Sequence, residues 1–260
     1  MTCTERDVIP RIREILSRDK EWSLYALGDL APAESIHCEW RFTSHDPPAV
    51  TLFYRAFDPP VFFAIGSAVA VERLLDEAPL PPSVYVHIRP EVLSLVSERY
   101  QRVMTKMMQR MILREPALAD FIGVETIAAD DLKELVELYD RRDGKEKEGT
   151  FFSPVQVVNG VYFGIRDHGR LVAAAGTHLI NRSESVAAVG NVFCLPEYRG
   201  KGLGARVISA VVTALIKEDI RTIGLNVGLE NPATKLYHRL GFRKACSYVE
   251  GSASRIADIQ

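Results

Sequence analysis

The sequence has only four cysteines in 260 residues, and they are widely scattered: Cys3, Cys38, Cys194 and Cys246. None of them forms a C-x-x-C pair, so their spacing indicates neither a zinc site nor a disulfide framework. We therefore expect reduced thiols that pack as small apolar side chains.

The sequence also lacks a basic excess and a long apolar run. A formal net charge of -2 argues against bulk binding to nucleic acid, although it is compatible with a small anionic ligand at one local site. The longest nearly uncharged run, residues 59–71, is too short to span a bilayer. The first residues carry charges where a signal peptide needs an apolar core. These absences predict a cytoplasmic protein that interacts with neither nucleic acid nor membranes.

What is present is typical of a soluble globular protein, because 47% of the residues are apolar and 25% are charged. A chain of this length forms one large domain or two of ordinary size. Residues 114–123 contain a proline, several small residues and a change of pattern. We therefore predict an α/β protein with an N-terminal domain over 1–118 and a second domain over 119–260.

Apolar periodicity and turn residues predict the elements of both domains. The expected N-terminal elements are helices near 8–16 and 22–28, two strands within 49–67, a strand at 83–88, a helix from 90 to 100, and a strand or buried linker at 106–113. The expected C-terminal elements are a helix at 130–139, a hairpin at 160–180 turning at 167–169, a strand at 186–194, a helix after residue 202, a strand at 222–228, a helix at 231–241 and a last strand at 242–251. The similar order in both halves leaves an internal duplication open.

The stretch RGKGLGA, residues 199–205, places three glycines at the start of a strongly apolar helix pattern. Missing side chains let a ligand approach backbone N–H groups, and the first N–H groups of a helix have no partner within it. The helix dipole adds positive potential there, and Arg199 and Lys201 add full charges. The stretch therefore predicts a phosphate-binding loop.

Two common phosphate-binding loops do not fit this stretch. A Walker loop needs Ser or Thr after its lysine, whereas Gly202 follows Lys201. The dinucleotide fingerprint fits GKGLGA with Ala205 in the last place, but it should follow a strand directly, and residues 196–198 intervene. The next strand also lacks the acidic residue of that fingerprint and carries Asn226 instead.

The segment NVFCLPEYRGKGLGA resembles motif A of the GNAT acyltransferase superfamily, [RQ]-x-x-G-x-[GA], with Arg199, Gly202 and Gly204 at its defining positions. The segment NPATKLYHRLGF is similar to motif B, with its tyrosine at Tyr237 and a closing Gly-Phe. The resemblance covers about residues 121–250. The hairpin resembles the subgroup related to glycine N-acyltransferases, which often carries a second, degenerate GNAT-like half upstream.

The resemblance implies a mostly antiparallel, twisted sheet with flanking helices, splayed between the family's fourth and fifth strands, after a second GNAT-like α/β half. Acetyl-CoA or coenzyme A would bind as a co-substrate, with the pantetheine arm in the gap, the pyrophosphate on the glycine loop, and no metal. The family asparagine normally lies seven residues before the tyrosine, where Glu230 stands, so Asn231 takes its place. The implied cofactor-binding residues are Val192, Phe193, Cys194, Arg199, Gly200, Lys201, Gly202, Leu203, Gly204, Ala205 and Asn231.

The resemblance further implies transfer of an acetyl group from acetyl-CoA to a primary amine by direct attack in a ternary complex. Tyr237 matches the family tyrosine that protonates the leaving thiolate, and a phenol with a pKa near 10 is largely protonated at neutral pH. Cys194 has a backbone role and is not a nucleophile. Many relatives carry a carboxylate base where Asn226 stands, so the general base stays open between a water chain and three side chains: His178, Asp167 and Glu125.

A second hypothesis is a non-catalytic acyl-CoA-binding or sensory module, which the missing carboxylate at Asn226 favours and Tyr237 disfavours. A small-molecule amine is favoured over a protein as the acceptor, because the N-terminal half would cover part of the cleft. The oligomeric state stays open. We expect no cofactor site in the N-terminal half, since Pro90 stands where its phosphate loop would lie and offers no N–H.

Overall fold

The computed structural model describes residues 5–43, 46–142 and 152–255. The chain divides into two compact units. Unit 1 comprises the chain up to Arg110 and again from Ala245, and unit 2 comprises Met111–Lys244. The sequence places a boundary near residue 118 and assigns the C-terminal strand to the second domain, whereas that strand belongs to unit 1 from Ala245 onward.

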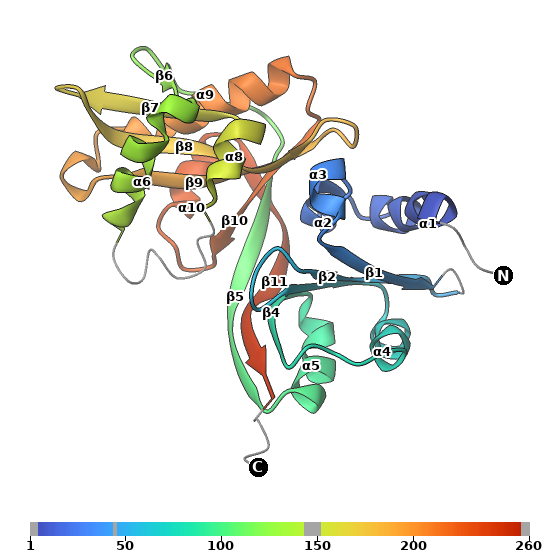
Figure 1. Ribbon diagram of the computed structural model, residues 1–260. Helices are drawn as coiled ribbons and strands as arrows, with labels where there is room; N and C mark the ends of the chain where they lie inside the picture. The colour runs from blue at the N-terminus through green and yellow to red at the C-terminus, as the bar shows by residue number, and fades with distance from the viewer. Residues whose placement is uncertain (1–4, 44–45, 143–151, 256–260) are drawn as a thin grey trace. The chain divides into compact units, whose positions relative to one another are not determined.

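Unit 1 is built on a mixed sheet in the order β1-β2-β3-β4-β11 (Figure 1). β3 and β4 are parallel, whereas the pairs β1–β2, β2–β3 and β4–β11 are antiparallel. Its elements are α1 (Glu5–Ser17), α2 (Leu24–Gly28), α3 (Pro32–Ser35), β1 (Cys38–Thr43), β2 (Ala49–Tyr54), β3 (Val61–Ile65), α4 (Ala68–Asp76), β4 (Ser83–Ile88), the 3-10 turn η1 (Pro90–Val92) and α5 (Leu93–Arg99). Two strands belong to both units: β5 (Arg102–Leu113) passes into unit 2 after Arg110, and β11 (Phe242–Ser254) passes into unit 1 at Ala245.

Helix α4 connects the parallel strands β3 and β4, and the sequence reasoning missed it. Its signal was present, because Ser67 is an N-cap whose Oγ accepts a hydrogen bond from the N–H of Ala70. The loop that precedes the helix between the parallel strands is therefore Gly66–Ser67, whereas Pro90 follows β4. A Cβ on Gly66 would lie 2.5 Å from the Cβ of Ala49, so this loop is closely packed.

Trp22 and Arg110 pack against the carboxyl ends of β3 and β4, and neither is exposed. The indole Nε1 of Trp22 donates a hydrogen bond of 3.0 Å to the carbonyl of Ala64 in β3, and its ring stacks on Phe63 at 5.2 Å. The Arg110 guanidinium donates to the carbonyl of Trp22 and lies 2.6 Å from Nε2 of His87 in β4. The ends of the two parallel strands are thus covered by the chain's own side chains.

Unit 2 contains a sheet in the order β10-β9-β8-β7-β6, in which only β9 and β10 are parallel. Figure 1 shows α6 and α8 on one face of β7–β9 and α9 behind these strands. Its elements are β6 (Glu125–Thr126), the 3-10 turn η2 (Ala129–Asp131), α6 (Leu132–Asp140), α8 (Pro154–Asn159), β7 (Tyr162–Asp167), β8 (Arg170–Asn181), β9 (Val186–Cys194), the 3-10 turn η3 (Pro196–Tyr198), α9 (Leu203–Lys217), β10 (Thr222–Gly228) and α10 (Thr234–Arg239).

The predicted α/β class with a mostly antiparallel sheet is confirmed, and so are the local elements of unit 2 that have strong signals. The hairpin turns at His168 and Gly169, whose φ angles of 47° and 78° suit a two-residue turn of type I′. Helix α8 was missed, although its start has local signals: Ser153 at the N-cap, Pro154 at the first helical position, and Gln156, whose Oε1 accepts a hydrogen bond from the N–H of Ser153. The strands β1 and β6 and the short helix α3 were missed as well.

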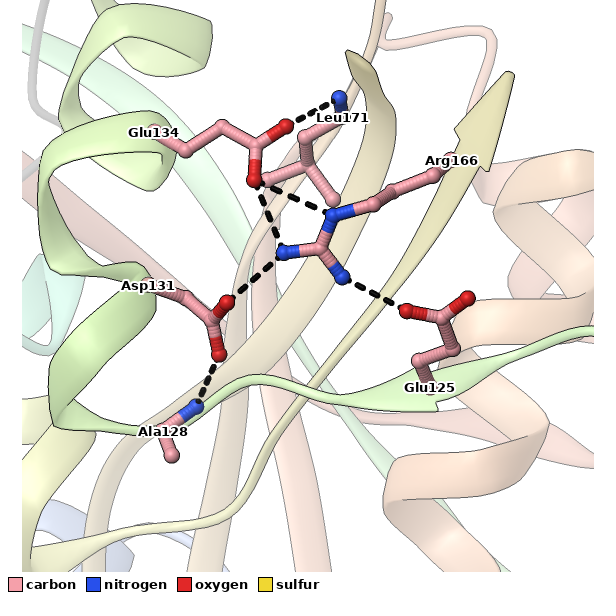
Figure 2. Close-up of polar contacts among 6 residues, drawn as sticks. All are labelled: Glu125, Ala128, Asp131, Glu134, Arg166 and Leu171. Atoms are coloured by element: carbon pink, nitrogen blue, oxygen red, sulfur yellow. Dashed lines mark hydrogen bonds and ion pairs between the residues drawn. The ribbon is translucent and has the colours of Figure 1, made fainter. Parts of the chain in front are cut away.

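A cluster of ion pairs around Arg166 of β7 joins α6 to the hairpin (Figure 2). Its guanidinium lies 2.6 Å from Glu125, 2.7 Å from Asp131 and 2.8 Å from Glu134. Glu134 also accepts a hydrogen bond of 2.5 Å from the N–H of Leu171 in β8. One arginine therefore holds carboxylates of β6, η2 and the first turn of α6, and we name these four charged side chains the Arg166 cluster.

Replacing Arg166 with glutamine is expected to destabilise the protein by about 1–3 kcal/mol, because three carboxylates lose their shared donor. The free energy of unfolding in urea measures this. Arg221→Gln is the matched control, since its pair with Asp219 is 78% and 84% exposed and such pairs contribute little. Equal stability of the two variants would contradict a structural role for the Arg166 cluster.

Candidate functional site

The strands β9 and β10 separate part-way along their length. Their parallel pairing runs from Val186–Thr222 to Ala188–Gly224. Both strands are fully described, and beyond these pairs the ladder between them ends, although β9 continues to Cys194. The predicted splay between two parallel strands is thus part of the fold of unit 2.

Two bulges lie beside this separation, one in β8 and one in β9. In β8 the extra residue is His178, because Thr177 pairs with Val189 and Leu179 pairs with Ala188. In β9 Gly190 pairs with Gly176 of β8, and Phe193 pairs with Ala174. β9 therefore spans three residues where β8 spans two, and its extra residue lies at 191–192. Bulges re-aim backbone and side chains and are common next to active sites.

The glycine loop has the backbone that its sequence demands. Gly200 and Gly202 have φ angles of 78° and 79°, and a Cβ added at either would meet nothing within 4 Å. Gly202 is the N-cap of α9, a helix of 15 residues. Gly204 lies in the first turn of α9 and does not have a positive φ. A Cβ added to Gly204 would meet only Leu236, at 3.5 Å. Open space beside free helical N–H groups fits an anionic group such as a pyrophosphate.

The two cations of the loop have defined contacts. Nε of Arg199 donates a hydrogen bond of 3.1 Å to the carbonyl of Cys194, and the guanidinium lies 5.7 Å from the centre of the Phe193 ring. The ammonium of Lys201 lies 4.8 Å from the centre of the Tyr198 ring. Arg199 thus ties the loop back to the end of β9, while Lys201 is exposed.

Tyr237 lies in α10 and is 8% exposed, with its ring edge-on to Phe242 at 6.2 Å. Burial raises the pKa of its phenol to about 12, so the hydroxyl stays protonated at neutral pH. No hydrogen-bond partner of this hydroxyl is found in the part of the chain that the structure describes. A protonated phenol of this kind can donate a proton or a hydrogen bond.

The other predicted binding residues lie around the same two segments. Leu203 and Ala205 are half-buried in the first turn of α9 and pack on the core of unit 2. Asn231 is exposed, and its side-chain oxygen accepts a hydrogen bond of 2.9 Å from the N–H of Ala233 before α10 begins. That contact closes a local turn two residues long before the helix, and the contact of Asn231 with a cofactor stays a prediction.

The three thiols among the described residues are free, and Cys3 lies outside those residues. Cys194 is half-buried, and burial raises the pKa of its thiol. A thiol that is protonated at neutral pH is a poor nucleophile, which agrees with the backbone role expected for Cys194.

Each of the three candidate bases has a feature that argues against this role. Burial and the nearby charge of Arg142 lower the pKa of His178 to about 4, so its imidazole is neutral but a weak base. Glu125 is paired with Arg166, and Asp167 accepts a hydrogen bond of 2.6 Å from the hydroxyl of Tyr198.

The sequence reasoning missed a buried group of polar side chains under the bulge of β9. Its centre is Asn191, which is 4% exposed and has a φ of 51°. Its hydrogen-bond partners come from α6, α8 and β7. A signal was present, because a Gly-Asn pair inside an apolar strand indicates a bulge.

The separated strands, the bulge and the glycine loop all lie in the part of the chain that matches a known family. Residues 124–242 match the acetyltransferase (GNAT) family. The chain has the GNAT fold, and proteins of this family use acetyl-CoA as a co-substrate. The match therefore supports an acyl-CoA-dependent acetyltransferase. None of the curated proteins compared with the chain matches it.

Solved structures share the GNAT fold over most of the chain. A putative GNAT acetyltransferase from Novosphingobium aromaticivorans is 22% identical with a TM-score of 0.63, over 92% of this chain and 100% of its own. A Drosophila protein is 14% identical with a TM-score of 0.66, and the similarity covers 92% of this chain and 88% of that protein. A GCN5-related N-acetyltransferase from Kribbella flavida is 17% identical with a TM-score of 0.58, and the similarity covers 92% of this chain and 95% of that protein. These similarities concern the fold and not the acceptor.

The described residues contain neither a metal-ligand cluster nor a membrane-spanning helix. Among residues 5–43, 46–142 and 152–255, no group of three or more His, Cys, Asp and Glu side chains is placed to hold a metal ion. No helix in this part of the chain combines the length and apolar character needed to cross a membrane.

Proposed function

We propose that the protein transfers an acetyl group from acetyl-CoA to the primary amine of a small molecule, in a ternary complex. The observation that carries this proposal is the end of the β9–β10 ladder at Ala188, together with the open glycine loop that lies between β9 and α9. A gap between parallel strands suits an extended pantetheine arm, and the loop suits its pyrophosphate.

In this proposal the backbone of Val192, Phe193 and Cys194 pairs with the pantetheine arm, and residues 199–205 hold the pyrophosphate. Bound acetyl-CoA supplies an activated acyl group. The amine nitrogen forms a bond to the acyl carbon, the carbon–sulfur bond breaks, and the thiolate takes a proton from Tyr237. The neutral amine attacks, and we propose that water takes the proton that its nitrogen loses as the bond to the acyl carbon forms. Tyr237 regains its proton from solvent after CoA has left.

A non-catalytic acyl-CoA-binding module is the second candidate, because Asn226 in β10 stands where relatives carry a carboxylate. Thiol release from acetyl-CoA in the presence of a panel of amines separates the two functions. An amine that accelerates thiol release supports the transferase, whereas CoA binding without release by any amine supports the module.

We further propose that unit 1 is a degenerate GNAT-like half without a cofactor site. Its parallel strands β3 and β4 take the place of the separated pair in unit 2, and its loop is the short Gly66–Ser67. Trp22 lies against the end of β3 and donates to the carbonyl of Ala64, where a pantetheine arm would need to pair.

Calorimetric titration is therefore expected to give one CoA per chain. Trp22→Phe, which keeps an aromatic ring but loses the indole N–H, should lower stability without adding a second site. A stoichiometry of two in the parental protein would contradict the assignment of unit 1 as degenerate.

A further inference from the structure

Asn191, the residue at the bulge of β9, is held by three other elements of unit 2. It has the left-handed backbone conformation that asparagine tolerates better than most residues. Backbone conformations of this kind persist only where surrounding contacts hold them, and they cluster at functional sites. Asn191 directly precedes Val192 and Phe193, the residues proposed to contact the acyl-CoA.

The side chain of Asn191 is fixed by two hydrogen bonds. Its Nδ2 donates to the hydroxyl of Tyr162 at 2.8 Å and to Oε1 of Gln156 at 3.0 Å. Gln156 is fixed in turn, because its Oε1 accepts from the N–H of Ser153 and its Nε2 donates to the carbonyl of His178. The first turn of α8 and the strand β7 therefore set the position of this carboxamide.

The backbone of Asn191 is fixed from α6. The hydroxyl of Tyr139 donates a hydrogen bond of 2.7 Å to the carbonyl of Asn191. Burial raises the pKa of Tyr139 well above its usual value, so the phenol remains a donor. The Arg142 guanidinium lies 3.8 Å from the centre of its ring, and the Phe152 ring is edge-on to it at 4.9 Å. The Arg166 cluster holds the opposite end of the same helix (Figure 2).

The carbonyl of Asn191 and the N–H of Val192 belong to one planar peptide group, and this peptide is trans. The C=O bond of Asn191 and the N–H bond of Val192 therefore point in opposite directions. A hydrogen bond that fixes the direction of the carbonyl also fixes the direction of the N–H. A hydrogen bond accepted by the carbonyl polarises the peptide and makes its N–H a stronger donor. Tyr139 thus acts on the Val192 N–H without touching it.

We infer that Tyr139 and Asn191 are positioning residues that aim the Val192 N–H at the acyl oxygen of acetyl-CoA. This inference rests on the proposed acetyl transfer. As the amine bonds to the acyl carbon, negative charge develops on that oxygen and disappears when the carbon–sulfur bond breaks. A donor whose direction is set beforehand stabilises this charge without reorganisation during the reaction.

Two variants test the inference separately. Tyr139→Phe keeps the ring beneath Arg142 and removes only the hydroxyl. Asn191→Gly allows the same backbone conformation and removes only the carboxamide. Each is expected to lower kcat for thiol release about tenfold, with KM for acetyl-CoA and the Kd of CoA nearly unchanged. The expected loss is smaller than that of deleting an oxyanion donor, because the N–H itself remains.

A readout without turnover is the amide resonance of Val192 in the ligand-free protein. It should shift in Tyr139→Phe, because the peptide loses the hydrogen bond at its carbonyl. Tyr100→Phe is the matched control, since it removes a hydroxyl that donates to the carbonyl of Pro81 in unit 1. That variant should keep the parental kcat and the parental Val192 resonance.

The outcomes separate this inference from the proposed function. A parental protein that binds no CoA and releases no thiol overturns acetyl transfer and this assignment together. Parental turnover with an unchanged kcat in both variants overturns the assignment alone. An unchanged Val192 resonance in Tyr139→Phe, or a rise in KM with kcat unchanged, also overturns it, because either indicates a role in stability or binding only.

Discussion

Replacing Tyr237 with phenylalanine is expected to lower kcat by about 10² to 10⁴ while the affinity for acetyl-CoA stays nearly unchanged. Burial raises the pKa of this phenol to about 12, so the hydroxyl is protonated and able to donate to the departing thiolate. The variant keeps the ring and its edge-on contact with Phe242. Loss of a group that acts only in the chemical step lowers kcat and kcat/KM together.

Steady-state kinetics of thiol release measure this effect, with the best amine of the panel as acceptor. Calorimetry with CoA measures binding separately. Tyr100→Phe again controls for the loss of one buried hydroxyl, and it should leave kcat unchanged. Parental turnover of Tyr237→Phe would show that Tyr237 is a packing residue, and the non-catalytic module would then become the better proposal unless another acid is found.

Replacing Gly204 with valine is expected to weaken CoA binding about tenfold to a hundredfold. Hydrogen bonds from backbone N–H groups to a charged acceptor contribute about 1.5–3 kcal/mol each, and the new side chain lies in the first turn of α9 beside the proposed pyrophosphate. Within the protein, the added Cβ meets only Leu236 at an ordinary contact distance of 3.5 Å, so the fold should survive. Calorimetry with CoA measures the change.

Gly202→Val tests the same site at a position where the backbone itself is strained, since its φ is 79°. Its matched control is Gly169→Val in the hairpin turn, where φ is 78° and the added Cβ also meets nothing within 4 Å. Both variants should lose similar stability, but only Gly202→Val should lose CoA affinity. Unchanged CoA affinity in folded Gly202→Val and Gly204→Val would remove the proposed pyrophosphate site.

Much of unit 2 could be read from short stretches of sequence, because its signals are local. The bounds of β9 and β10 agree with the predicted strands, and the hairpin turns at the predicted residues. The helical pattern after Gly202 and the open glycine loop also agree. In each case a few neighbouring residues decide the conformation through side-chain periodicity or through a φ that only glycine adopts easily.

In unit 1 the sequence did not reveal which loop lies between parallel strands. The sequence reasoning considered a loop at Pro90, whereas β3 and β4 are parallel and the loop that precedes α4 between them is Gly66–Ser67. Whether two strands are parallel depends on partners far apart in sequence. Trp22 bonds to Ala64, which is 42 positions away, and Arg110 bonds to Trp22, which is 88 positions away. No local sequence pattern predicts contacts between residues so far apart.

The sequence by itself determined the GNAT resemblance and the glycine loop, and it singled out Tyr237 as a candidate acid, because each depends on a short motif of neighbouring residues. Only the tertiary structure decided where the β9–β10 ladder ends, where the bulges lie, and which side chains hold Asn191. The physical reason is register: a strand's hydrogen-bond partners are set by pairing with distant strands, and one extra residue changes the direction of every group that follows.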